Sequence, residues 1–176
     1  MIIVLITANP RLKILKIDTE RFHLRELSDS DASERYLSWF QDTTTQQFIA
    51  KKAETISQLK EYILEKKTDK NCLFLGVFYQ GIHIGNIKYE PIDISKAQAT
   101  MGILIGEKDW RGKGVAGEVI MASSIYLREH YGINRILLGV EQENSAAVQA
   151  YNKLGFVKYK VTPDGLYMSL ELNSVN

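Results

Sequence analysis

The chain lacks several features that would place it in particular classes of protein. Its one cysteine, Cys72, excludes an internal disulfide and a zinc site built from cysteines. Its net charge of +1 lacks the basic excess of a nucleic-acid-binding protein. The short apolar run Ile2–Ile6 has no basic segment ahead of it, so neither a signal peptide nor a membrane span is predicted. We therefore expect a cytoplasmic protein that has no metal and binds neither nucleic acid nor membrane.

The composition is otherwise that of an ordinary globular domain. With 176 residues, of which 45% are hydrophobic, the chain is long enough for one domain with a substantial core. We expect residues 1–12 to form a leader or an extra strand, and residues 13–176 to form the single domain.

Apolar periodicity and turn signals predict a mixed order of strands and helices. Strands are predicted at 14–17, 22–27, 72–79, 82–89, 98–105, 135–140, 158–161 and 166–172, and helices at 28–42, 55–66, 115–130 and 145–154. One strand–helix–strand step, from 100–105 to 135–140, makes two strands parallel neighbours. We therefore expect an α/β (α+β) fold with a mixed, mostly antiparallel sheet flanked by helices. Gly102 predicts a bulge or a close backbone approach.

The segment Trp110-Arg111-Gly112-Lys113-Gly114-Val115-Ala116-Gly117 predicts a phosphate site at the start of a helix. Glycines let backbone amides approach a ligand, the helix start carries partial positive charge, and Arg111 and Lys113 add full charges. The glycine spacing also matches the dinucleotide fingerprint, but the charged segment 107–111 separates the strand from the first glycine. A Walker loop is excluded because Gly114 replaces the residue that would hold magnesium.

On two motifs the chain resembles the GNAT superfamily of N-acetyltransferases. The first is Arg/Gln-x-x-Gly-x-Gly/Ala at a helix start, which reads Arg111-Gly112-Lys113-Gly114-Val115-Ala116 here. The second is an Asn followed by a helix with a Tyr and a Gly-Phe ending, which reads Asn144…Tyr151-Asn152-Lys153-Leu154-Gly155-Phe156. The opening Thr19-Glu20-Arg21-Phe22…Leu24-Arg25 is similar to the branch that includes ribosomal-protein N-terminal (Rim-type) acetyltransferases.

The resemblance implies acetyl-CoA as co-substrate. Its pyrophosphate would lie on amides of residues 111–116, and its pantetheine along Ile103, Leu104 and Ile105, where the sheet opens beside 135–140. An amide near Leu104 would polarise the thioester carbonyl. Asn144 would contact pantetheine, or would only cap the next helix. The resemblance also places Lys153 at the cofactor.

For catalysis, the resemblance makes Tyr151 the proton donor to the leaving thiolate. The alternative is that Tyr151 is only an aromatic residue of the core. Many members of this branch carry a glutamate base in an Ala-Glu-x-Gly pattern, where this chain has Ala99-Thr100-Met101-Gly102. Because Thr100 cannot act as that base, Glu141 is the best remaining carboxylate. Its alternative role is that of a solvated charge at a strand end.

The acceptor is predicted only as a primary amine: a nucleotide-linked amino sugar, another small amine or a protein N-terminus. Tyr36, Trp39 and Phe40, beside the polar run 43–47, would form an acceptor-binding wall or would simply pack a helix on the sheet. A catalytically silent acyl-CoA-binding regulatory domain and a nucleotide-binding module of another fold remain as alternatives. A homodimer is one open alternative for the assembly.

Overall fold

The structure is a computed structural model that describes residues 15–42, 53–163 and 165–172. Its elements are β1 (Lys16–Asp18), β2 (His23–Glu26), the 3-10 turn η1 (Asp29–Asp31), α1 (Glu34–Ser38), α3 (Ile56–Thr68), β3 (Leu73–Tyr79), β4 (Ile82–Asp93), η2 (Ile94–Lys96), β5 (Gln98–Ile105), η3 (Lys108–Trp110), α4 (Val115–Tyr131), β6 (Arg135–Val140), α5 (Ser145–Lys153), β7 (Val157–Thr162) and β8 (Gly165–Glu171). The predicted leader at 1–12 and the polar run 43–47 lie outside the described residues. Within the described ranges, no helix is both long and apolar enough to cross a membrane.

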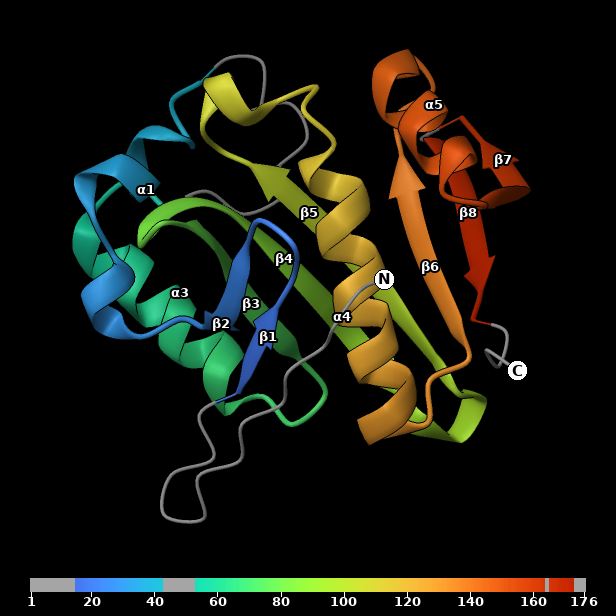
Figure 1. The fold of residues 1–176 in the computed structure, drawn as a ribbon, viewed down its shortest axis with the longest axis horizontal. Coiled ribbons are helices and arrows are strands. Elements are labelled where there is room, and N and C mark those ends of the chain that lie inside the picture. Colours follow the sequence, from blue (N-terminus) through green and yellow to red (C-terminus); the bar gives the residue numbers. More distant parts are fainter. Residues whose placement is uncertain (1–14, 43–52, 164, 173–176) are drawn as a thin grey trace.

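The strands of the described residues form one sheet in the order β1-β2-β3-β4-β5-β6-β8-β7. Every neighbouring pair is antiparallel except β5 and β6, which are parallel. This confirms the mixed, mostly antiparallel sheet with a single parallel step (Figure 1). The predicted bounds of β5 and β6 agree with the structure, whereas the first strand is Lys16–Asp18 rather than 14–17.

Two hydrophobic cores lie on opposite faces of the sheet, because side chains of a strand alternate between its faces. In β3, Leu73, Leu75 and Val77 belong to the larger core, which packs against α4. Phe74 and Phe78 belong to the smaller core, which packs against α1 and α3. Each face of the sheet is thus covered by its own helices, and α4 crosses the face that is turned toward the viewer in Figure 1.

The predicted helix at 28–42 is divided in two. The predicted capping box of Ser28 and Asp31 is present, but it begins only the 3-10 turn η1. A second cap follows at once, because the Ser33 side chain accepts a hydrogen bond from Tyr36 N at 3.2 Å and starts α1 there. Ala32 between them is extended, so the two caps cannot serve one continuous helix.

The bulge predicted at Gly102 is wrong. Gly102 pairs in regular register with Lys88, and the shift between β4 and β5 lies instead between Tyr89 and Ile92. Pro91 falls in that interval and has no N–H to donate, which is why the irregularity belongs to β4. A Cβ atom at Gly102 would meet no protein atom within 4 Å, so no described backbone approaches it closely either.

Candidate active site

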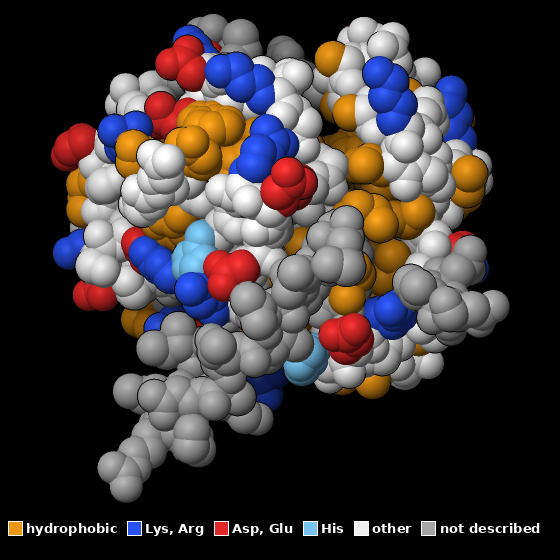
Figure 2. Space-filling view, in the orientation of Figure 1, with side chains coloured by type: hydrophobic (Ala, Val, Ile, Leu, Met, Phe, Trp, Pro, Cys, Tyr) orange, Lys and Arg blue, Asp and Glu red, His pale blue; other side chains and the backbone are white. Residues whose placement is uncertain are grey.

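The parallel strands β5 and β6 separate soon after they begin. They pair only over Gln98–Thr100 and Arg135–Leu137, and beyond that point they diverge (Figure 1). We call the gap between Met101–Ile105 and Leu138–Val140 the strand opening. Figure 2 shows a hollow between the part of the molecule that carries β5 and the part that carries β6, with hydrophobic side chains on its walls. A ligand can therefore enter between the carboxyl-terminal halves of the two strands and reach backbone groups of β5 that no neighbouring strand pairs.

The backbone of β5 alternates in direction at this opening. Gly106 N donates to Ile84 O at 3.0 Å, so in the antiparallel pair the N–H and C=O of Leu104 also face β4. Those of Ile103 and Ile105 face the opposite way, into the strand opening. The amide near Leu104 that the resemblance implies is therefore that of Ile103 or Ile105.

The end of β5 is held in place by Trp39, at the end of α1, and by Arg111. A Cβ atom built on Gly106 would lie 2.0 Å from the Trp39 indole, so only glycine fits there. Arg111 donates to Ile105 O and Gly106 O at 2.9 Å each, and its guanidinium pairs with Asp42 at 2.9 Å. The expectation that the Arg111 charge serves the phosphates is corrected by this geometry, because the side chain holds the loop after β5.

The amides that follow Arg111 are left without protein partners. Arg111 N itself donates to Lys108 O at 3.1 Å, which removes it from the predicted set. Among the described residues, no acceptor receives the N–H groups of 112–114, and those of 115–117 belong to the first turn of α4. We call residues 112–117 the amide cradle. They include the predicted Gly112, Lys113, Gly114, Val115 and Ala116.

Two glycines shape the amide cradle. Gly112 and Gly114 have φ values of 71° and 76°, in the left-handed region that favours glycine. A Cβ atom at Gly112 would stand in open space, and one at Gly114 would lie 3.6 Å from Arg21 Nη2. A side chain at either position would therefore take up the space above the amides. A row of free amides at a helix start, with partial positive charge, fits the pyrophosphate of CoA.

The other side of the strand opening is formed by the end of β6 and by α5. Glu141 directly follows β6, and its carbonyl accepts a hydrogen bond from Asn144 N at 3.1 Å. The Asn144 side chain accepts from Ala147 N at 3.2 Å and so caps α5, as the plain alternative predicted. Lys153 is exposed at the last position of α5. Figure 1 places α5 above the end of β6, across from the start of α4.

Tyr151 lies on α5 with its ring against the larger core. Its ring centroid is 5.6 Å from that of Phe156. Burial raises the pKa of Tyr151, so the hydroxyl keeps its proton at neutral pH, as a proton donor must. The hydroxyl makes no hydrogen bond to any described residue. The side chain is thus packed by its ring while its oxygen stays free for a ligand.

The predicted acceptor wall is buried. Tyr36, Trp39 and Phe40 expose 1%, 3% and 7% of their surface and form the centre of the smaller core. Trp39 Nε1 donates to Glu107 at 3.0 Å, so even its polar atom is used within the protein. The packing role is confirmed, and contact of these residues with an acceptor stays a prediction.

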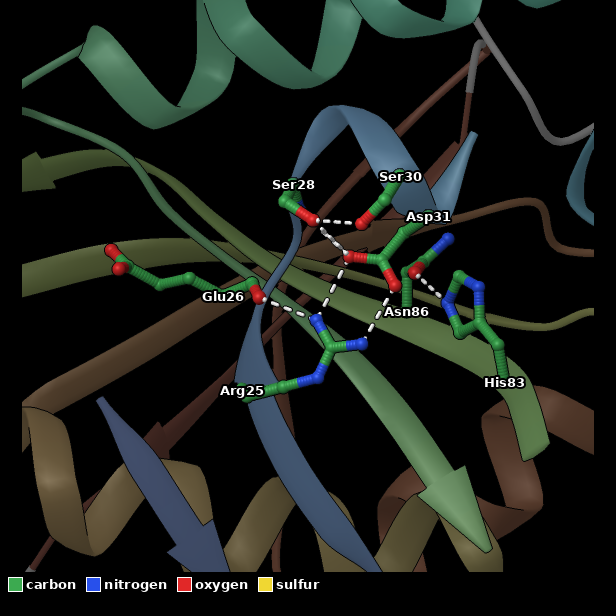
Figure 3. A network of polar contacts seen from close by, with 7 residues as sticks. All are labelled: Arg25, Glu26, Ser28, Ser30, Asp31, His83 and Asn86. Atoms are coloured by element: carbon green, nitrogen blue, oxygen red, sulfur yellow. Dashed lines mark hydrogen bonds and ion pairs between the residues drawn. The ribbon is translucent and has the colours of Figure 1, made fainter. Parts of the chain in front are cut away.

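A polar network beside this core was not predicted from the sequence (Figure 3). Arg25 binds both carboxylate oxygens of Asp31, at 2.8 and 2.6 Å. His83, which is buried among aromatic rings, pairs through Nε2 with Asn86 Oδ1 at 2.8 Å, and its Nδ1 has no partner among the described residues. Burial lowers the pKa of His83, so the ring is neutral at neutral pH. The partners are only six and three residues apart in the sequence, but no motif marked them, because each pairing depends on how the strands and the 3-10 turn orient the side chains.

The fold and the site together define a class of protein. A mixed sheet that opens between two parallel strands, with free amides at a helix start beside the opening, is the arrangement expected of an acetyl-CoA-dependent acetyltransferase.

Comparison with known proteins identifies the family. The acetyltransferase (GNAT) domain family matches residues 21–157, well over half of the chain, so the chain belongs to the GNAT family of N-acetyltransferases, which use acetyl-CoA as donor. The uncharacterised N-acetyltransferase p20 of Bacillus licheniformis is 28% identical over 80% of this chain and 81% of its own. The uncharacterised N-acetyltransferase YoaA of Bacillus subtilis is 26% identical over 87% and 89%.

Solved structures agree on the fold. A candidate ribosomal-protein-serine acetyltransferase from Vibrio cholerae superposes with a TM-score of 0.78 at 18% identity, covering 89% of this chain and 97% of that one. The dodecameric spermidine N-acetyltransferase from Vibrio cholerae has a TM-score of 0.72 at 21% identity, covering 88% and 95%. At these identities the likeness is one of fold.

Proposed function

We propose that the protein transfers the acetyl group of acetyl-CoA to a primary amine by direct attack of the amine on the thioester, within the strand opening. The observation that carries this proposal is the set of unpartnered groups around the opening. The β5 amides of Ile103 and Ile105 face it, the amide cradle lies at one end, and the free hydroxyl of Tyr151 belongs to the opposite side. A cluster of donors that no protein group uses, beside a helix start with partial positive charge, is available to an anionic ligand.

The residues divide the reaction into three tasks. The amide of Ile103 or Ile105 donates to the thioester oxygen and stabilises the negative charge that develops there. Glu141, or water, accepts the proton that the ammonium must lose before the nitrogen can form its bond to the carbonyl carbon. As the carbon–sulfur bond breaks, Tyr151 donates its proton to the sulfur, and CoA leaves as a thiol. The nitrogen, which became positively charged in the attack, releases its surplus proton, and this proton restores the Tyr151 hydroxyl directly or through water. The acetyl group supplied by acetyl-CoA ends as an amide on the acceptor.

The acceptor is proposed as an uncharged primary amine of one of three kinds. A similar fold belongs to a spermidine N-acetyltransferase, which makes a polyamine one choice, and another to a candidate ribosomal-protein-serine acetyltransferase, which makes a protein N-terminus the second. A nucleotide-linked amino sugar is the third. The spermidine enzyme is dodecameric. The oligomeric state of this protein, for which a homodimer is one alternative, should therefore be measured by sedimentation alongside the activity. We propose the cytoplasm as the place of action.

The test is thiol release from acetyl-CoA by purified protein, measured with each class of acceptor and without any. We expect release well above the acceptor-free rate with one class. Tight binding of CoA without release for any acceptor would instead support the silent acyl-CoA-binding domain. Binding of a nicotinamide dinucleotide as tight as that of CoA would contradict the assignment of the amide cradle.

A further inference from the structure

The turn between β1 and β2 is tied to the first turn of α4. Glu118, in that first turn, accepts hydrogen bonds from Thr19 Oγ1 at 2.5 Å, from Arg21 N at 2.7 Å and from Arg21 Nε at 2.7 Å. Burial raises the pKa of Glu118, but these hydrogen bonds and the Arg21 charge outweigh burial and leave the pKa below its ordinary value. The carboxylate is therefore charged at neutral pH and holds the turn against the start of the helix.

This contact fixes the Arg21 guanidinium in one orientation. Its Nε is held by Glu118 Oε2, and its Nη1 donates to Lys113 O at 3.0 Å. The group also lies over the Phe22 ring, 4.7 Å from the ring centroid. Three contacts thus hold the guanidinium, and less side-chain entropy remains to be lost when it binds a ligand.

The remaining nitrogen, Nη2, lies beside the amide cradle. It makes no hydrogen bond to a described residue, and it is 3.6 Å from a Cβ atom built on Gly114. Gly114 is the N-cap of α4, where the free amides begin. The nitrogen therefore borders the space that a side chain on Gly114 would enter, which is the space assigned to phosphate.

We propose that Arg21, through Nη2, is a phosphate-binding residue for CoA, and that Glu118 is the residue that positions it. The proposal rests on acetyl-CoA as the donor and is independent of the acceptor. It assigns to Arg21 the cationic role that the sequence suggested for Arg111, whose side chain holds the carbonyls of Ile105 and Gly106 instead. Arginine suits this role because its planar fork can bind phosphate oxygens through several N–H groups at once.

The local charges are consistent with a moderate effect. Arg21 and Glu118 form a pair with no net charge, so the pair does not attract a phosphate from a distance. Its contribution must come from a directed, charge-assisted hydrogen bond at short range. Lys113, whose ammonium lies 5.6 Å from the centre of the Trp110 ring, remains as an exposed cation of the cradle.

The test is calorimetric titration of the full chain without acceptor, comparing Arg21→Gln with the control Arg135→Gln. Arg135 also forms an exposed ion pair, with Glu171, but it stands at the start of β6, away from the cradle. For Arg21→Gln we expect the Kd of CoA to rise on the order of 10-fold. For Arg135→Gln and for the phosphate-free ligand pantetheine we expect no change.

A third ligand, dephospho-CoA, identifies the phosphate. Equal weakening of CoA and dephospho-CoA by Arg21→Gln assigns the contact to the pyrophosphate, whereas weakening of CoA alone assigns it to the ribose 3′-phosphate. The proposal is overturned if Arg21→Gln binds CoA within about two-fold of the control. It is also overturned if pantetheine is weakened as much as CoA, because that pattern indicates a general loss of structure.

Two more variants keep the test decisive if Arg21→Gln folds poorly. Arg21→Lys keeps the charge and removes the fork, so CoA affinity should fall partway. Glu118→Gln leaves Arg21 in place but loosens it, so CoA affinity should fall partway as well and the unfolding midpoint should change little. Unchanged CoA affinity in both variants would contradict the proposal. Because no acceptor is used, a failure of acetyl transfer would leave this result unaffected.

Discussion

The amide cradle and the aromatic cluster under α1 handle their polar groups in opposite ways. In the cradle, the amides of 112–114 have no partner among the described residues, and two left-handed glycines keep the space above them open. In the cluster of Tyr36, Trp39 and Phe40, the rings are buried and Trp39 Nε1 is bound to Glu107. Both regions were candidate binding sites in the sequence, and both are rich in residues that bind ligands elsewhere.

The difference is instructive because residue type alone did not separate the two regions. Aromatic side chains bury large areas and pack in cores as readily as they line binding sites. Free backbone amides at an exposed helix start contribute no packing and are left to water or to a ligand. Changes near the cradle should therefore affect ligand binding and turnover more than stability, and changes in the cluster should do the reverse.

The largest effect is expected for Tyr151→Phe, which keeps the ring against Phe156 and removes only the hydroxyl. If the hydroxyl protonates the thiolate, kcat should fall by roughly 10²–10⁴ while stability and acetyl-CoA affinity barely change. Steady-state kinetics and thermal unfolding of the same samples measure both quantities. A fully active variant would remove Tyr151 from the mechanism and leave its ring as a packing residue.

In the aromatic cluster, Phe40→Ala should lower the free energy of unfolding by about 3–5 kcal/mol, because it leaves a cavity against Tyr36. CoA affinity should stay near that of the wild type, and denaturant unfolding with calorimetry tests both. Phe40→Leu is the matched variant, since it retains much of the packing without the ring. A large rise in acceptor KM for Phe40→Leu would show that the cluster also binds the acceptor and is not only a packing region.

In the cradle, Gly114→Glu should weaken CoA binding by roughly 10-fold or more, since a carboxylate would occupy the phosphate space and repel it. Gly132→Glu at the far end of α4 is the control for backbone strain, because Gly132 is also left-handed, with a φ of 67°. Both variants should lose similar stability, and only the first should lose CoA affinity. Equal CoA affinity in both would remove the cradle from the site.

The smallest effect concerns the polar network beside the cluster. Burial raises the pKa of Asp31, but the hydrogen bonds from Arg25 and Ser28 outweigh burial and hold the pKa below its ordinary value. A carboxyl with a depressed pKa stabilises the fold above its unfolded pKa, so this contribution should be complete above about pH 4 and lost as the pH falls through the lower folded value.

Asp31→Asn should therefore cost about 1–2 kcal/mol at pH 7 and progressively less at lower pH. The exposed neighbour Asp29 has no ion-pair partner among the described residues, and Asp29→Asn is the control. Urea unfolding of both variants between pH 3 and pH 7 measures the difference. A cost for Asp31→Asn that does not change with pH would contradict the assigned role of its charge.

The sequence by itself determined the features that depend on local patterns. The strands Gln98–Ile105 and Arg135–Val140, the helix that starts at Val115 and the glycines at 112 and 114 all follow from periodicity, caps and turn chemistry, which act over a few residues. The parallel step followed from the order of these elements, because a strand, a helix and a strand connect in only one common way.

The tertiary structure decided which partner each of several groups uses. The Arg111 guanidinium holds carbonyls of the preceding loop and pairs with Asp42, 69 positions earlier, and the bulge belongs to β4 rather than to Gly102. Arg21 binds Glu118 of α4, which lies 97 positions later in the sequence. Partner choice of this kind depends on which segments the fold brings within hydrogen-bonding distance. Local pattern carries no information about that, since the same side chain can bind a ligand or a neighbouring carbonyl.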